Sequence, residues 1–258
     1  MVSLEVMPWF SPAVSPEISR VMHNLGYRTE FWPGDEIGRR FFRRVVFMAS
    51  GFAAGAVIAP GQHAPLLMTL AGAGSFAVTG SALSIDDNQP RRCWALTRCT
   101  TLSVSPEILL RLSEVESAWN KELTSYYVRR CVSERFGQMV CHVAKPDRRL
   151  GVLMATSLEA VEQPAVHGKS RSADEGWVRL PHLPSRKLIA SVISCSSTTL
   201  DQVIRDWSEQ GILRHADGSL WMKKTAVVEH RQWLTPFLQM QKDIENAVNV
   251  RQNFHFPE

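Results

Sequence analysis

Short polar side chains gather on one side of the segment 196–205. At 3.6 residues per helical turn, positions spaced by four lie in one row along a helix, and two adjacent rows make up one face. This face would carry Ser197, Thr198, Asp201, Gln202 and Arg205. A glutamine amide can make paired hydrogen bonds to adenine, and a threonine methyl group can touch the thymine methyl. The pattern therefore predicts a helix that reads base edges in the major groove of DNA.

The flanking residues predict how this helix begins. Ser196 can cap it by accepting a backbone N–H, and its hydroxyl and the amides of the first turn suit a phosphate oxygen. Ser185 would cap a shorter helix before it, with Ser194 and Cys195 in the turn between the two. The expected DNA contacts are Ser185, Ser196, Ser197, Thr198, Gln202 and, on phosphate, Arg205.

Asp201 is an acidic side chain on this polar face, where DNA phosphates would repel it. Two interpretations remain open: it accepts a hydrogen bond from a cytosine amino group, or it pairs with Arg205 one turn later. Together with Asp206 it leaves the helix nearly neutral. A near-neutral helix also favours an alternative, in which the module binds proteins and has lost strong DNA contacts.

Two short apolar runs, at 212–215 and 219–222, flank Ala216, Asp217 and Gly218. An Asp-Gly turn between such runs is a strong signal for a β-hairpin. A first helix, a turn, a second helix and a hairpin follow one another over residues 183–222. This order predicts a winged helix-turn-helix.

The first 105 residues alternate short apolar runs with turns rich in glycine and proline. We expect seven strands, at 27–31, 45–48, 54–58, 66–70, 76–78, 93–97 and 101–104. Regular short strands favour an antiparallel, jelly-roll-like β-roll. A basic run at 39–44 is either a solvated loop or a contact with DNA, an anion or a partner.

A long helix is expected after Ser105, where a capping serine, a proline and an acidic residue follow one another. Because no glycine or proline follows until Gly137, and Pro146 comes next, one helix could occupy 106–145. At 1.5 Å per residue it would be about 60 Å long, more than a small domain covers. We expect it to pair with its copy in a homodimer. The expected seam is Val115, Trp119, Leu123 and Tyr126. The alternative is a helix, or two helices broken near Gly137, that packs only on its own chain.

Composition limits the class of protein. The chain has 258 residues, 45% of them hydrophobic, and a net charge of +4, which permits a nucleic-acid partner without requiring one. Five cysteines without a Cys-x-x-Cys pair favour a reducing cytoplasm. No apolar run is long enough for a membrane span. Because no nucleophile–base pair, metal-ligand cluster or phosphate loop is evident, we expect neither an enzyme nor a metal site.

The order of these parts resembles the bacterial catabolite-activator/fumarate-nitrate regulator (Crp–Fnr) superfamily. The likeness covers most of residues 25–224 and is strongest at 194–205, while 95–105 resembles the last strand of the family's β-roll. It implies an α+β protein with a β-roll sensor-like domain (1–105), a dimerisation helix (106–145) and a winged-helix DNA-binding domain with a helical extension (146–258). The resemblance also implies that Ser197, Thr198 and Gln202 read the bases. Because the family often has arginine and glutamate there, its usual target sequence does not carry over.

The β-roll departs from the family's cyclic-nucleotide cassette. Residues 74–80 supply no glutamate, and Arg91, Arg92 and Cys93 lack the hydroxyl of the family's Arg-Ser/Thr-Ala run. We therefore expect a cyclic-nucleotide-binding-like domain that binds no cyclic nucleotide, and no cofactor. Two nearby cysteines are too few for an iron–sulfur cluster. One histidine or cysteine suffices for haem, so a haem or redox signal stays open.

The sequence as a whole predicts a cytoplasmic, sequence-specific transcription regulator that binds an inverted-repeat operator as a homodimer. RNA polymerase is a further candidate partner. The alternative is a regulatory protein-interaction module with a degenerate sensor and weak or no specific DNA binding. The tail at 226–258 is expected to form an amphipathic helix packed on the DNA-binding domain or on the dimer partner.

Overall fold

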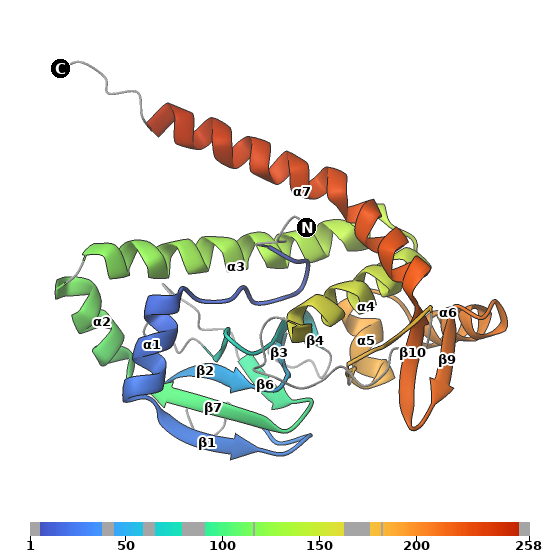
Figure 1. Ribbon diagram of the computed structural model, residues 1–258, viewed down its shortest axis with the longest axis horizontal. Coiled ribbons are helices and arrows are strands. Elements are labelled where there is room, and N and C mark those ends of the chain that lie inside the picture. Colours follow the sequence, from blue (N-terminus) through green and yellow to red (C-terminus); the bar gives the residue numbers. More distant parts are fainter. Residues whose placement is uncertain are drawn as a thin grey trace.

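The computed structural model describes residues 6–37, 44–58, 65–78, 91–115, 117–162, 176–181 and 183–252. Strands dominate its first part and helices the rest, so the expected α+β class with an antiparallel N-terminal β-roll is confirmed (Figure 1). Most of the basic run, residues 39–43, lies outside the described residues.

The β-roll consists of two antiparallel sheets. Their strand orders are β1-β7-β2-β5 and β4-β3-β6. All seven expected strands are present: β1 (Tyr27–Phe31), β2 (Val45–Ser50), β3 (Ala53–Ile58), β4 (Pro65–Ala71), β5 (Phe76–Val78), β6 (Arg91–Ala95) and β7 (Cys99–Val104). A short helix that the sequence analysis did not predict, α1 (Pro16–Leu25), precedes them, and the Ser15 hydroxyl caps it.

Strand β2 explains why the roll has layers on both sides of its first sheet. Side chains alternate between the faces of a strand, and Val45 to Met48 are nevertheless all buried. Val45 and Phe47 pack in a cluster with residues of the helices, whereas Val46 and Met48 pack with residues of the second sheet. The first sheet is therefore covered by helices on one face and by the second sheet on the other.

The region expected to form one long helix contains two helices, α2 (Pro106–Val115) and α3 (Ser117–Val143). The expectation of a single helix over 106–145 is therefore wrong, and Figure 1 shows α2 turned sharply away from the axis of α3. The change of direction lets Leu109 of α2 enter the same apolar cluster as Trp119 and Leu123 of α3. Packing on the β-roll outweighs the continuous helical pattern of the sequence.

Gly137 does not break α3, contrary to the alternative weighed above. It is buried, and a Cβ built there would lie 2.4 Å from Cδ1 of Trp9. The glycine therefore makes room for the N-terminal segment, which crosses α3 at this point. Trp9 N–H donates to the Ser133 carbonyl at 3.3 Å, and Trp9 O accepts from Leu70 N–H at 2.7 Å.

The C-terminal part is a winged helix-turn-helix. It comprises α4 (Pro146–Glu162), β8 (Trp177–Arg179), α5 (Arg186–Val192), α6 (Ser197–Glu209), β9 (Leu213–Ala216) and β10 (Ser219–Lys223). The three strands form one antiparallel sheet in the order β8-β10-β9. The hairpin β9–β10 was expected, whereas β8 was not.

The tail forms α7 (Lys224–Gln252), with Pro236 inside the helix. Its first part packs on α4, with Ala226, Val227 and Leu234 buried, and the Phe237 ring lies 6.3 Å from that of Phe136. The expectation of a helix packed on the DNA-binding domain is confirmed for this part. The rest of α7 runs away from the body in Figure 1.

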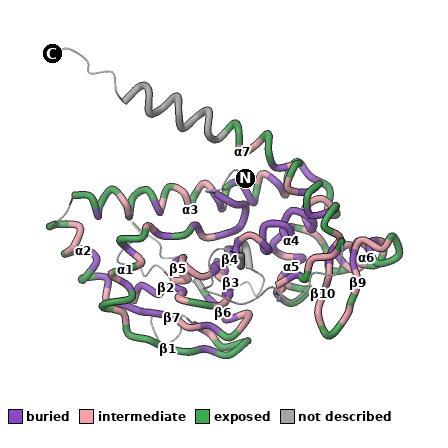
Figure 2. Tube along the Cα trace, in the orientation of Figure 1, coloured by how far each residue is buried: buried purple, intermediate pink, exposed green. Residues whose placement is uncertain are grey.

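The largest apolar cluster extends across both halves of the molecule. It joins Phe52 and Leu70 of the β-roll to Val140 of α3, Ile189 of α5 and Leu200 of α6, and Figure 2 shows buried segments continuing from the strands into α4 and α5. Helix α5 packs directly on β4. The β-roll and the winged helix therefore share one core. Among the described segments, no helix has the length and apolar character needed to cross a bilayer.

Candidate nucleic-acid interface

Helix α5 and the turn after it place the start of α6. The Ser185 hydroxyl caps α5 by accepting the Leu188 N–H at 3.4 Å. Ile189, Ala190 and Ile193 are buried, which fixes the inner side of α5 and of the turn. In the turn, Ser194 has φ 50, and Cys195 N–H donates to the Ala190 carbonyl at 2.9 Å. The turn lies where the sequence predicted it.

Helix α6 carries the predicted polar face. Ser196 is its N-cap and accepts the Thr199 N–H at 3.0 Å. Leu200 and Trp207 are buried on the inner side. The six side chains predicted to contact DNA are all exposed: Ser185, Ser196, Ser197, Thr198, Gln202 and Arg205. The fold thus brings these side chains to the surface around the start of α6.

The polar side chains of α6 already have partners within the protein. Asp201 Oδ1 lies 2.8 Å from Arg186 Nη1 across the helix-turn-helix, so its partner is not Arg205 as one interpretation held. Gln202 Nε2 donates to Asp206 Oδ1 at 2.7 Å. A glutamine amide that contacts a base must exchange this hydrogen bond for one to DNA. Arg186 could not be identified from the sequence, because its partner is 15 positions away.

A second arginine, Arg149 of α4, holds the turn between α5 and α6. Its guanidinium donates to the carbonyls of Ala144, Ile193 and Ser194 at 2.7, 3.1 and 3.0 Å. No sequence signal pointed to this residue, because its acceptors are backbone atoms that only the fold brings together.

The hairpin of the wing turns at Asp217 and Gly218, which have φ 51 and φ 66. Positive φ at both central residues matches the twist of a two-residue hairpin, and glycine adopts it without strain. On the three-stranded sheet, the Arg214 guanidinium lies 4.4 Å from the Trp177 ring centre and 5.5 Å from that of Trp221. The sequence predicted the turn but not this stack of an arginine and two indoles.

The predicted dimer seam lies mostly inside the protomer. Trp119, Leu123 and Tyr126 are 7%, 6% and 0% exposed, and all three pack in the cluster beneath the first sheet. The rings of Tyr126 and Phe76 lie 5.0 Å apart. These three side chains therefore cover the β-roll of their own protomer; of the four residues predicted to form the seam, Val115, 82% exposed, is the one left at the surface.

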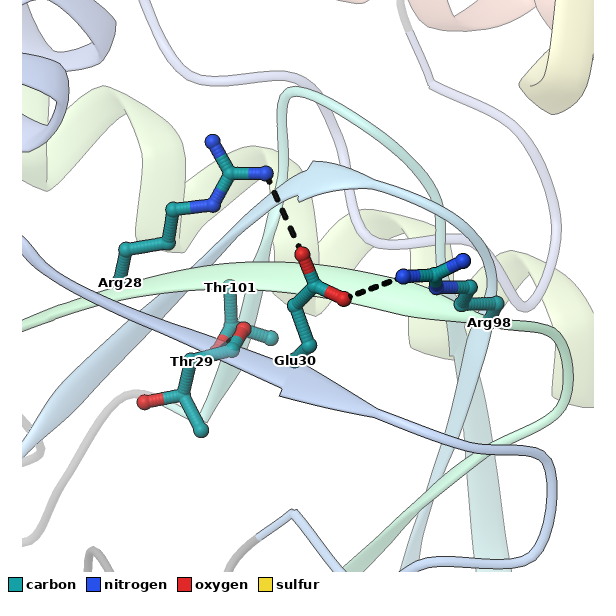
Figure 3. Close-up of polar contacts among 5 residues, drawn as sticks. All are labelled: Arg28, Thr29, Glu30, Arg98 and Thr101. Atoms are coloured by element: carbon teal, nitrogen blue, oxygen red, sulfur yellow. Dashed lines mark hydrogen bonds and ion pairs between the residues drawn. The ribbon is translucent and has the colours of Figure 1, made fainter.

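The described part of the β-roll presents its charged groups at the surface. Arg92 forms an ion pair with Glu36 at 2.9 Å and stacks 5.2 Å from the Trp94 ring centre. Figure 3 shows Glu30 between Arg28 and Arg98, at 3.4 and 2.6 Å. Hydrogen bonding to Arg98 is the main cause that lowers the pKa of this exposed Glu30 carboxyl. These arginines are matched by surface carboxylates.

The Cys93 thiol lies in the interior of the β-roll. Burial raises the pKa of the Cys93 thiol to about 12, so it stays protonated at neutral pH. Within the residues described, no three histidine, cysteine or carboxylate side chains lie together as a group that could hold a metal ion.

The chain matches no protein-family model, and no curated protein matches its sequence. Solved structures do match it. FixK2 from Bradyrhizobium japonicum is 12% identical over 78% of this chain and 93% of its own, with a TM-score of 0.57. The c-di-GMP-responsive regulator CLP from Xanthomonas campestris is 15% identical over 80% of this chain and 97% of its own, with a TM-score of 0.55. A transcriptional regulator of the Crp/Fnr family from Eubacterium rectale is 10% identical over 84% of this chain and 95% of its own, with a TM-score of 0.58. The chain therefore has the fold of regulators of the Crp/Fnr family.

Proposed function

We propose that the protein is a sequence-specific DNA-binding transcription regulator that places α6 in the major groove. The observation that carries the proposal is the exposed polar face at the start of α6. Ser197, Thr198 and Gln202 project from the first two turns, where short side chains reach base edges. Arg205 lies further along the same face, at the position expected to contact a phosphate.

We further propose that the protein acts as a homodimer, through a side of α3 different from the one first expected. Val128 is 57% exposed and, by helical periodicity, lies opposite Trp119 and Tyr126. The same side carries small and apolar residues seven positions apart, Ala118, Ser125 and Val132. This spacing is typical of a helix that pairs with a second helix.

A dimer of this kind makes a geometric demand on its operator. Two recognition helices related by a two-fold axis should sit about 34 Å apart, so the half-sites should be inverted and one helical turn apart.

Cys131, the exposed member of the five cysteines, lies three residues from Val128. A short bismaleimide should therefore join two copies through Cys131, and Cys131→Ser should abolish the cross-link.

The test of DNA reading begins with selection of bound sequences from genomic DNA and footprinting of the enriched site. Gln202→Ala should cost about 1–3 kcal/mol on that site and relax the preference at one base pair in each half-site. Arg205→Ala should weaken all sequences alike and reduce the salt slope by roughly one unit. Gln210→Ala, which removes an exposed glutamine from the far end of α6, is the matched control. Unchanged sequence preference in Gln202→Ala would mean that another residue reads the groove.

The second candidate function is a protein-interaction module. It is favoured by the acidic groups on α6, because Asp201 and Asp206 engage the neighbouring Arg186 and Gln202. Such a module would bind duplex DNA weakly and without preference. A salt series separates the two, since a regulator that contacts several phosphates loses affinity steeply as salt rises.

A further inference from the structure

Arg149 sits where the C-terminal ends of two helices meet. Its Nε donates to the carbonyl of Ala144, just past the end of α3, at 2.7 Å. Its Nη1 donates to Ile193, the C-cap of α5, at 3.1 Å, and to Ser194 at 3.0 Å. The last carbonyls of a helix have no partner inside the helix, and they carry the negative end of its dipole. One guanidinium thus satisfies both helix ends with hydrogen bonds and opposite charge.

The carbonyls it holds belong to the turn that aims the recognition helix. Ser194 has φ 50, a left-handed conformation that is uncommon for a residue other than glycine. Ser196, two residues later, caps α6. A fixed turn therefore fixes the direction in which α6 leaves α5, and Arg149 ties that turn to the end of α3.

The surroundings of Arg149 connect the same elements. The Cys141 thiol, in the last turn of α3, lies 3.5 Å from the carbonyl of Val192 in α5. Cys195 follows Ser194 in the turn. Burial is the main cause that raises the pKa of both thiols. In Figure 1, α4 lies between α3 and α5. The hydrogen bonds of Arg149 therefore connect α4 to the residue after α3 and to the C-cap of α5.

We propose that Arg149 is a positioning residue that fixes the angle between α3 and the recognition helix, and through it the spacing of operator half-sites. This inference rests on the proposed function. In a dimer built on α3, the two α6 helices keep a set separation only if each is held rigidly to its own α3. Lysine cannot replace the arginine, because a single ammonium lacks the planar fork that spans the two helix ends.

The experiment measures affinity for duplexes whose half-sites have the selected spacing or a spacing changed by one and two base pairs. Arg149→Gln should lower affinity about tenfold at the selected spacing and less at the altered spacings, so that spacing selectivity shrinks. Arg149→Lys should also lower the affinity at the selected spacing and shrink the spacing selectivity. The salt slope should not change, because the guanidinium is turned to backbone carbonyls and not to DNA. Undiminished spacing selectivity in either folded variant overturns the proposal, and so does a loss of about one unit of salt slope.

The matched control is Arg231→Gln. Arg231 is also half-buried and also binds α4, through Glu159 at 2.8 Å, but it lies on α7 and does not touch the turn. This variant should lose stability without losing spacing selectivity.

Hydrogen exchange gives a readout that does not depend on DNA. The amides of residues 193–196 should exchange about tenfold faster in Arg149→Gln or Arg149→Lys than in Arg231→Gln. If the unmodified protein shows no DNA binding, the proposed function fails while this measurement still decides the role of Arg149. Equal exchange in the three variants would show that Arg149 does not hold the turn.

Discussion

Asp201 places a negative charge on the polar face of α6, the face proposed to meet DNA. Its carboxylate pairs with Arg186, and both side chains are largely exposed, at 44% and 63%. Exposed pairs of this kind contribute between about 0 and 1 kcal/mol to stability. Asp201 therefore affects DNA affinity far more than it affects folding.

Asp201→Asn should strengthen binding to all duplexes. It removes a negative charge from the face that meets phosphates and releases Arg186 to contact one, so the salt slope should steepen by roughly one unit. Fluorescence anisotropy at several salt concentrations measures both effects. Glu209→Gln, which removes the same charge from the exposed far end of α6, should change little. A loss of affinity confined to sites with one particular cytosine would instead assign Asp201 to base reading.

His230 gives the protein a stability that depends on pH. It is 6% exposed, its ring lies 5.6 Å from that of Trp207, and a Cβ at Gly151 would lie 2.1 Å from its Nε2. Burial, and then the charge of Arg148, lower the pKa of this histidine to about 4. In the unfolded chain it binds a proton below pH 6.5, whereas in the folded protein it does so only near pH 4.

Stability should therefore be lost as pH falls from about 6.5 to about 4, by at most about 3 kcal/mol from this residue. Carboxylates titrate in the same range, so the comparison is with His230→Gln, which cannot take up the proton. Urea unfolding at each pH should show a smaller fall in the variant. The exposed His215→Gln serves as control and should follow the unmodified protein. If the free energy of unfolding fell equally with pH in all three proteins, His230 would not be a cause of the pH dependence.

Among the elements, α3 has two faces with different tasks. The side with Leu123 covers the β-roll, whereas the side with Val128 faces solvent. Leu123→Glu should destabilise the protomer by about 3 kcal/mol or more, because it places a charge in an apolar cluster. Val128→Glu should leave thermal stability nearly unchanged and weaken the proposed dimer.

Sedimentation and thermal unfolding separate these outcomes. Val228→Glu is the control for the surface variant, since Val228 is 49% exposed on α7. It should affect neither measurement. A Leu123→Glu protein that is folded but monomeric would show that the dimer forms through the Leu123 face of α3, as first expected. A dimer that Val128→Glu leaves intact would show that the Val128 face is not the dimer interface.

The helix-turn-helix was predictable because its signals are local. The capping serines 185 and 196, the apolar spacing and the Asp-Gly turn each act within a few residues of the chain. The face of α3 was not predictable, because periodicity identifies an apolar side but not what covers it. The same holds for the change of direction after Val115 and for the Arg149 contacts, which depend on packing between distant segments.

At the scale of the whole molecule, the expected domain boundaries fall just before α2 and α4, yet the largest apolar cluster crosses both. Leu70 of β4 is 0% exposed within it, and α5 packs on β4. A winged helix with part of its core on the β-roll is not free to rotate on a linker. Any signal that repositions it must first separate α5 from β4, at the cost of exposing apolar surface.

This shared core predicts that the two halves unfold together. Leu70→Ala should cost about 2–5 kcal/mol, because it leaves a cavity where both halves meet. Hydrogen exchange should then become faster in α5 and α6 as well as in β3, and calorimetry should show a single transition. Val104 lies in the separate cluster beneath the first sheet. Val104→Ala therefore tests whether a cavity in that cluster also makes exchange faster in α5 and α6. If the halves were independent, Leu70→Ala would leave the protection of α6 unchanged and a second transition would appear. The β-roll would then be a separate domain, and a signal could turn the DNA-binding half without breaking the contact between β4 and α5.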